Sequence, residues 1–144
     1  MIHGKPVIAV IDTNVLVSGL LTGEAGAPTS LVLDGMLVRQ FDFLLSKELM
    51  TEYRAVLLRP KIRKLHRLST EEVDQVLTEI AANGIVREPR QSRIQPPDKG
   101  DKHLWALLGT HRKAVLVTGD RRLLKSTHFA GRIMTPREFI DRVS

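Results

Sequence analysis

The stretch at residues 7–21, VIAVIDTNVLVSGLL, most constrains what this chain can fold into. It begins with five apolar residues rich in β-branched side chains, which is typical of a buried strand. Asp12 follows at once, and Thr13 and Asn14 then open a second apolar segment, 15–21, which we interpret as a short helix. A carboxylate placed directly after a buried strand lies where open α/β sheets bind their ligands.

Strand-like and helix-like segments alternate along the rest of the chain. We predict strands at 41–45, 85–86, 114–118 and 133–134. We predict helices from residue 28, at 47–58, 70–83 and 101–112, after residue 120 and from residue 136. This alternation favours right-handed crossovers between parallel strands, with helices on both faces of the sheet. The predicted fold class is therefore α/β, a three-layer sandwich with a central, mostly parallel sheet of about five strands.

Capping residues support several of these helix starts. Ser46 is expected to cap the helix that follows it. Two S/T-x-x-E sequences, Ser69 with Glu72 and Thr135 with Glu138, match the capping box. The helices at 47, 70 and 136 are therefore predicted from local chemistry as well as from periodicity.

Length and composition limit the classes of protein to which this chain can belong. At 144 residues the chain is expected to form one domain, 1–144, with a core large enough to need no disulfide or structural metal. It has no cysteine, which excludes a zinc–thiolate site, a disulfide framework and a thiol nucleophile. We find no apolar run long enough to span a membrane and no signal peptide before Asp12, so we expect a cytoplasmic protein.

The net charge of +6 favours a polyanionic partner, either nucleic acid or an acidic protein. The densest basic run, at 59–67, holds five Arg or Lys residues and one His. We interpret it first as a solvated connection between helices. A contact for RNA phosphates or for an acidic protein segment is the alternative.

Four acidic residues are expected to meet at one edge of the sheet. They are Asp12 and Asp120, each after a predicted strand, Asp101 at a predicted helix start, and Glu52 on the helix at 47–58. Each one alone is more often a cap or turn residue than a ligand. Together they would repel one another, and a divalent cation removes that repulsion. Their hard oxygen donors suit Mg²⁺ or Mn²⁺ rather than zinc.

A metal held in this way points to phosphodiester chemistry. It polarises a phosphate and lowers the pKa of bound water, which then attacks phosphorus. Basic residues bind the phosphate backbone, so a basic chain with an acidic metal site indicates a nuclease. Because such water needs no histidine base, we interpret His103 and His111 as ordinary positions of the predicted helix at 101–112.

Five motifs in this order resemble PIN-domain proteins over about residues 7–140. They are D-T-N-x-L-V after the first strand, the glutamate in SKELMTEYRAVL, R-P-K, D-K-x-L at the start of a helix, and L-V-T-G-D. The closest likeness is to the toxin components of toxin–antitoxin systems, the VapC-like ribonucleases.

The resemblance implies a metal-dependent endoribonuclease that prefers single-stranded RNA and leaves a 5′-phosphate. By that likeness the catalytic and metal-binding acids are Asp12, Glu52, Asp101 and Asp120. Asn14 and Thr118 match polar positions that orient a carboxylate or water. The implied partners are single-stranded RNA, an acidic antitoxin protein and a second copy of the chain in a homodimer.

The chain departs from the family pattern at two places. The second acid that often follows the last aspartate is replaced by Arg122, which could leave only one metal tightly held. Around the third acid the sequence reads PPDKGDKHL, so Asp98 could assist or replace Asp101 as a metal ligand. Arg121 and Arg122 follow Asp120 directly, and we expect them to contact a substrate phosphate.

Two rival functions remain at this point. A phosphatase of the haloacid-dehalogenase type also has an aspartate after a strand, but it needs D-x-D, and Asn14 cannot serve as the second acid. A PIN-like module that binds RNA or a partner without cutting is the non-enzymatic alternative, and Arg122 is the residue that favours it. Metal-dependent cleavage would separate these possibilities.

Overall fold

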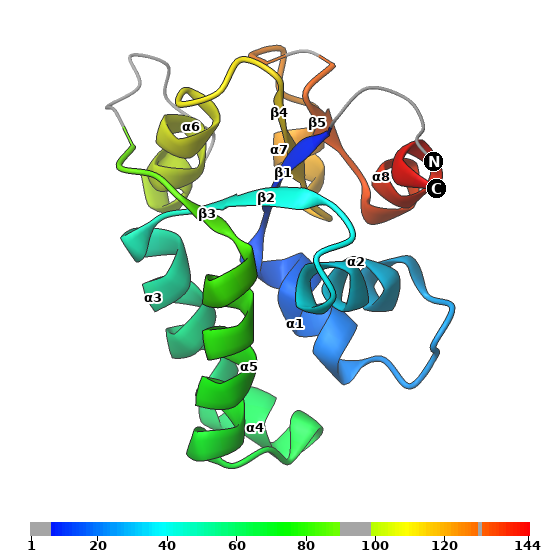
Figure 1. The fold of residues 1–144 in the computed structure, drawn as a ribbon, viewed down its shortest axis with the longest axis vertical. Helices are drawn as coiled ribbons and strands as arrows, with labels where there is room; N and C mark the ends of the chain where they lie inside the picture. The colour runs from blue at the N-terminus through cyan, green and yellow to red at the C-terminus, as the bar shows by residue number, and fades with distance from the viewer. Residues whose placement is uncertain (1–6, 90–98, 130) are drawn as a thin grey trace.

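The computed structural model describes residues 7–89, 99–129 and 131–144. The described residues form a five-stranded sheet in which every paired strand is parallel (Figure 1). The strand order is β3 (Ile85–Val86), β2 (Asp42–Leu45), β1 (Ile8–Ile11), β4 (Ala114–Val117) and β5 (Ile133–Met134). The prediction of a mostly parallel sheet of about five strands is confirmed, and β1 lies at its centre.

Helices cover both faces of this sheet (Figure 1). The strand order runs from β1 through β2 to β3 and then reverses to β4 and β5, and right-handed crossovers in opposite directions place their helices on opposite faces. One layer holds α1 (Thr13–Leu21), α2 (Pro28–Leu37), α3 (Lys47–Leu57) and α5 (Thr70–Asn83), which pack against one another. The chain then crosses back over the sheet through α6 (Lys102–Leu108), which contacts β1 and β4, and continues through α7 (Arg121–Leu124). The C-terminal α8 (Pro136–Val143) packs on α2.

The predicted caps are present. The Ser46 hydroxyl accepts a hydrogen bond from the Leu49 N–H at 3.1 Å and so begins α3. Capping boxes begin α5 and α8, with both hydrogen bonds formed in each. Asp12 and Asp120 also cap helices, α1 and α7, because their carboxylates accept backbone N–H groups of the first turn.

The core is one apolar cluster that runs through the sheet and both helical layers. Trp105, Tyr53, Phe43 and Phe139 are among its largest fully buried side chains. At Gly84 a Cβ atom would lie 2.4 Å from a Leu45 methyl group, so the chain can pass from α5 to β3 here only without a side chain.

The basic run at 59–67 connects α3 to α5 and is largely exposed, as interpreted, but most of it forms a helix, α4 (Pro60–His66), that was not predicted (Figure 1). Pro60 at the first position fixes a helical φ, and Arg67 ends the helix in the left-handed region at φ 60°. The His66 ring links α4 to the end of α3, because its Nε2 lies 2.8 Å from the Leu57 carbonyl oxygen. Its Nδ1 accepts the Leu68 N–H at 2.9 Å.

The helix predicted at 101–112 is also shorter than expected. A 3₁₀ turn at Lys99–Asp101 precedes α6, and α6 ends at Leu108 in a turn where the Thr110 hydroxyl bonds to the Leu107 carbonyl oxygen. Other boundaries agree to within about two residues. No helix in the ranges described above is long and apolar enough to cross a membrane.

Candidate active site

The pairing of β1 with β4 brings two distant polar residues together at the carboxyl edge of the sheet. Ile11 is in register with Val117, and the Asp12 N–H continues the ladder to the Val117 carbonyl oxygen at 3.0 Å. The following residues, Asp12 and Thr118, are therefore neighbours. The Thr118 hydroxyl donates to Asp12 Oδ2 at 2.7 Å, and both residues are buried.

Further hydrogen bonds hold the Asp12 carboxylate in one orientation. The Thr13 N–H donates to Oδ1 at 2.8 Å, and the Asn14 amide donates to Oδ2 at 3.2 Å. The Asn14 Oδ1 in turn accepts the Gly119 N–H at 3.3 Å, which links the two strand ends. Thr118 also accepts the Asp120 N–H at 3.0 Å, so one hydroxyl orients both aspartates.

Glu52 reaches this edge from the middle of α3. Its Oε2 accepts a hydrogen bond from the Thr13 hydroxyl, and its Oε1 lies 3.5 Å from Nε2 of His103 on α6. The next residue, Tyr53, is fully buried, and its hydroxyl donates to the Ile11 carbonyl oxygen at 2.5 Å. Three elements, α1, α3 and α6, therefore converge beside Asp12.

Burial and neighbouring negative charges shift the pKa values of two groups at this site. Burial raises the pKa of the Asp12 carboxyl, against the lowering effect of the Thr118 and Thr13 hydrogen bonds, and the charges of Glu52 and Asp120 raise it further. Burial raises the pKa of the Tyr53 hydroxyl well above its ordinary value, with smaller contributions from Asp12 and Glu52. A cation bound at this edge would favour the ionised form of Asp12.

The other predicted acids lie in different surroundings. Asp120 accepts the Arg122 N–H at 2.9 Å and lies 3.6 Å from the Arg122 guanidinium. Asp101 ends the 3₁₀ turn before α6 and makes no side-chain capping bond there. Asp98 falls outside the described residues. The assignment of these acids as ligands stays a prediction.

The donor chemistry fits a hard divalent cation, because carboxylates are hard oxygen donors and the charges of Glu52 and Asp120 act on the Asp12 carboxyl. Within the described ranges, however, no three His, Asp or Glu side chains are grouped closely enough to hold a metal ion on their own. A cation here would therefore need some side chains to turn inward, or water to fill the remaining positions.

Sequence reasoning missed three residues of this site. Thr13 lies inside the D-T-N motif, but its position in the sequence does not predict a hydrogen bond to Glu52, 39 residues away. Tyr53 follows Glu52 in the sequence, but no local motif predicts the bond of its hydroxyl to the Ile11 carbonyl oxygen. His103 was interpreted as an ordinary helix position, whereas its side chain is 9% exposed and its ring faces Glu52. Its place two residues after Asp101 is the one signal that could have suggested it.

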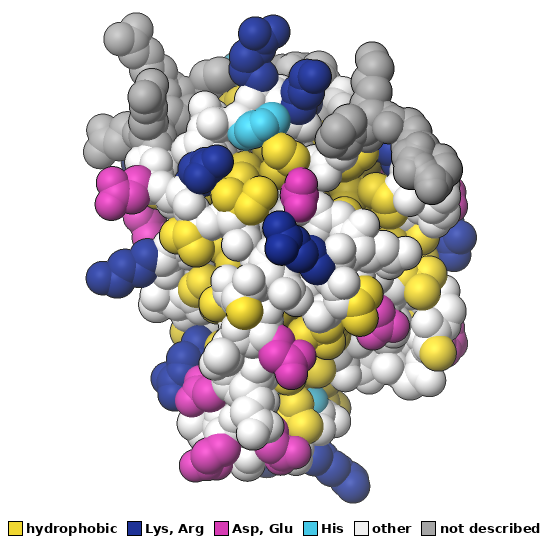
Figure 2. Space-filling model, in the orientation of Figure 1, with side chains coloured by type: hydrophobic (Ala, Val, Ile, Leu, Met, Phe, Trp, Pro, Cys, Tyr) yellow, Lys and Arg dark blue, Asp and Glu magenta, His cyan; other side chains and the backbone are white. Residues whose placement is uncertain are grey.

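The basic residues do not form a single cluster over the face shown in Figure 2. Acidic side chains gather there over the lower part of the molecule, where α5 begins, and basic ones are dispersed over the whole face. Arg121 and Arg122 are exposed and follow Asp120 directly in the chain. The contact of these two residues with a substrate phosphate stays a prediction.

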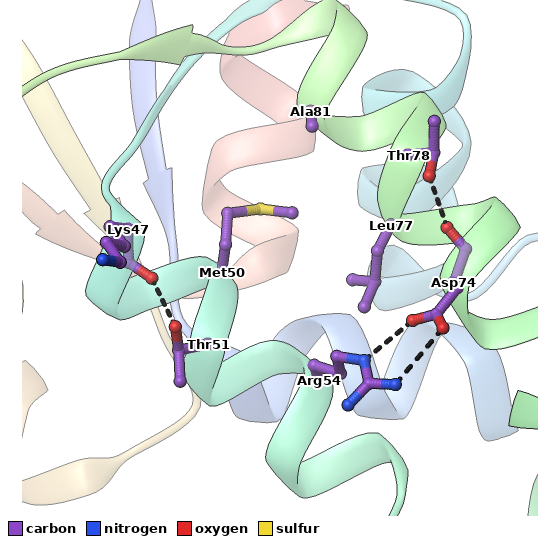
Figure 3. A pocket seen from close by; sticks show the side chains of 8 residues that line it. All are labelled: Lys47, Met50, Thr51, Arg54, Asp74, Leu77, Thr78 and Ala81. Atoms are coloured by element: carbon purple, nitrogen blue, oxygen red, sulfur yellow. Dashed lines mark hydrogen bonds and ion pairs between the residues drawn. The ribbon is translucent and has the colours of Figure 1, made fainter.

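A separate hollow of about 380 Å³ lies between α3 and α5 (Figure 3). Met50 and Leu77 line it, and Arg54 pairs with Asp74 at 2.8 Å across it. Its α3 residues fall on one face of the helix, at positions 47, 50, 51 and 54. Glu52 lies on another face, so this hollow is not part of the candidate site.

A family model described as the PIN domain matches residues 8–122, from β1 into α7. No curated protein matches the chain. The matched span contains Asp12, Glu52, Asp101 and Asp120. PIN domains generally use divalent metals. Because the match covers most of the chain, this protein belongs to the PIN-domain family, whose members are typically nucleases.

Proposed function

We propose that the protein is a divalent-metal-dependent endoribonuclease that hydrolyses phosphodiester bonds of single-stranded RNA. The observation that carries this proposal is the buried Asp12 carboxylate, oriented by Thr118 and Asn14 and coupled electrostatically to Glu52 and Asp120. A buried acid whose pKa is raised by its surroundings at a strand end is a candidate for function rather than for stability.

The cation would be Mg²⁺ or Mn²⁺, held by the carboxylates of Asp12, Glu52, Asp101 and Asp120, with Asp98 as a further candidate. When bound, such an ion supplies a Lewis acid for the phosphate and lowers the pKa of water. The side chains of the protein itself then orient Asp12 and bind the substrate. Thr118 and Asn14 hold Asp12 in place, and Arg121 and Arg122 bind a substrate phosphate.

The biological setting that fits this activity is the toxin half of a toxin–antitoxin pair in the cytoplasm. The net charge of +6 suits both RNA and an acidic antitoxin. We also expect the protein to act as a homodimer. These proposals rest on the resemblance of the sequence to VapC-like ribonucleases.

Replacing Asp12 with Asn tests the nuclease proposal. The amide keeps an oxygen that can accept the Thr13 N–H, so the variant should stay folded. Because the carboxylate charge is lost, cleavage of labelled single-stranded RNA in Mn²⁺ or Mg²⁺ should fall by at least about 100-fold, and EDTA should abolish wild-type cleavage. The matched control is Asp141→Asn, an exposed acid on α8, which should cut at the wild-type rate.

Cleavage by Asp12→Asn at the wild-type rate would show that the site is assigned wrongly. If the wild type binds RNA but does not cut it with either metal, the protein is the non-cutting PIN-like module. Arg122 favours that alternative, because its guanidinium lies 3.6 Å from the Asp120 carboxylate and competes with a cation for it. The dehalogenase-type phosphatase has no support, since Asn14 donates to Asp12 and offers no acid.

A further inference from the structure

We propose that His103 is a metal ligand of this site, with His103 Nε2 and Glu52 Oε1 binding the same divalent ion. The nitrogen donor makes Mn²⁺, rather than Mg²⁺, the preferred ion. This inference rests on the proposed metal-dependent function, and it adds a ligand outside the acidic residues named from the sequence.

The first support is the burial of the His103 ring together with the hydrogen bonding of its two nitrogens. The side chain is 9% exposed, and neither Nδ1 nor Nε2 has a hydrogen-bond partner in the part of the chain that the structure describes. Buried side-chain nitrogens nearly always have a partner, and an exception needs a reason. The other part-buried histidines follow the rule, since both nitrogens of His66 and Nδ1 of His111 are in hydrogen bonds.

The second support is the place of the ring. Nε2 lies 3.5 Å from Glu52 Oε1, while the other oxygen of Glu52 accepts the Thr13 hydroxyl. Two donors that bind one cation at about 2.1 Å each lie about 3.0–3.5 Å apart. The imidazole and the carboxylate are therefore spaced as two ligands of one ion would be, and the bond from Thr13 to Oε2 leaves Oε1 as the oxygen nearest the imidazole.

The third support comes from the number of ligands that such ions need from a protein. Mg²⁺-sized ions often keep several waters and take only one or two carboxylates from the chain. A pair of protein donors is thus sufficient even though the described side chains offer no group of three. Asp12 lies beside the pair, and its charge contributes to the potential that attracts a cation.

The metal preference follows from the donor types. Oxygen-only sites suit Mg²⁺ and Mn²⁺ alike, whereas imidazole suits transition metals. A site with one nitrogen donor should therefore bind Mn²⁺ more tightly than Mg²⁺. Removing the imidazole should weaken Mn²⁺ binding more than Mg²⁺ binding.

The experiment is pulsed electron paramagnetic resonance of the protein loaded with Mn²⁺, beside calorimetric titrations with Mn²⁺ and Mg²⁺. We expect ¹⁴N modulation from a directly bound imidazole in the wild type and its loss in His103→Gln. We also expect that variant to bind Mn²⁺ about ten-fold or more weakly. The matched control is His128→Gln, which removes an exposed imidazole and should leave the signal and the affinity unchanged.

Each other outcome overturns the proposal in a recognisable way. If wild-type Mn²⁺ binds and supports RNA cleavage but shows no ¹⁴N modulation, His103 is not a ligand, and the nuclease proposal stands. If His103→Gln lowers the melting temperature of the metal-free protein but not its Mn²⁺ affinity, His103 and Glu52 form a structural ion pair instead. If neither metal binds and no cleavage occurs, both proposals are wrong.

Discussion

Asp12 and Thr118 each make several hydrogen bonds at the candidate site. Asp12 caps α1, accepts the Thr118 hydroxyl and carries the charge proposed to bind metal. Thr118 orients Asp12 with its proton and the Asp120 backbone with its oxygen. Because these side chains are buried and mutually bonded, a change at one position should be felt at the others.

Tyr53→Phe tests how much the buried hydrogen bond of the Tyr53 hydroxyl contributes to the stability of the protein. Tyr53 is fully buried, and its hydroxyl donates to the carbonyl oxygen of Ile11, the residue before Asp12. The variant removes the donor and leaves that buried carbonyl without it. The free energy of unfolding, measured by urea titration, should therefore fall by about 1–3 kcal/mol.

Thr51→Ala is the control for this prediction. It removes a hydroxyl from the same helix, α3, that also donates to a backbone carbonyl oxygen, but at an exposed position. Its effect should be about 0.5 kcal/mol or less. Equal effects of the two substitutions would mean that burial of the Tyr53 bond contributes nothing to stability.

At this scale the sequence allowed only part of the site to be predicted. Asp12, Asn14, Thr118 and Asp120 are named by motifs next to strands, and the structure gathers them at adjacent strand ends. His103 could not be assigned in this way. Its position beside Glu52 depends on which face of α6 meets α3, and that packing is a tertiary contact without a local signal.

At the scale of elements, helix starts are the best-predicted features. Each capping box is complete within four residues, so its chemistry is visible in the sequence. Helix ends are less predictable. The end of α6 at Leu108 and the formation of α4 depend on turns and on the His66 ring, which bonds back to α3.

The capping boxes predict a pH dependence of stability. Hydrogen bonds from the cap residues lower the pKa of Glu72 and of Glu138 below the ordinary value of 4.5. A carboxyl whose pKa is lowered by folding stabilises the protein above the unfolded value, and that contribution is lost as pH falls through the folded pKa. The double variant Glu72→Gln, Glu138→Gln should therefore melt at a lower temperature than the wild type at pH 7, and the difference should shrink below about pH 4.5.

Thermal melts at a series of pH values measure this difference. The control is Glu79→Gln, which changes an exposed acid on α5 outside the capping box and should show no such convergence. A difference that stays constant from pH 7 to pH 3 would mean that the glutamate charge is not what stabilises these helix starts.

At the scale of the whole molecule, one core joins the two helical layers through the sheet. The apolar cluster contains residues from β1, β2 and β4 and from helices on both faces, so no layer buries its apolar surface alone. We therefore expect the chain to behave as a single domain, as its length suggests.

Urea unfolding should then be one cooperative transition. Trp105, the single tryptophan, is fully buried on α6 and packs edge-on against Phe129, so its fluorescence reports the layer opposite α3 and α5. Far-ultraviolet circular dichroism reports helices of both layers. The two curves should coincide, and separate midpoints would contradict a single folding unit.

The sequence by itself determined the fold class, the succession of strands and helices along the chain apart from α4, the capped helix starts and the acids at strand ends. These features depend on periodicity and on contacts within a few residues, which the chain displays directly. Only the tertiary structure decided which side chains meet. The register of β1 with β4 brings Thr118 to Asp12, and the packing of α6 against α3 brings His103 to Glu52. Residues that are 106 and 51 positions apart meet only because the whole core buries its apolar surface in one arrangement.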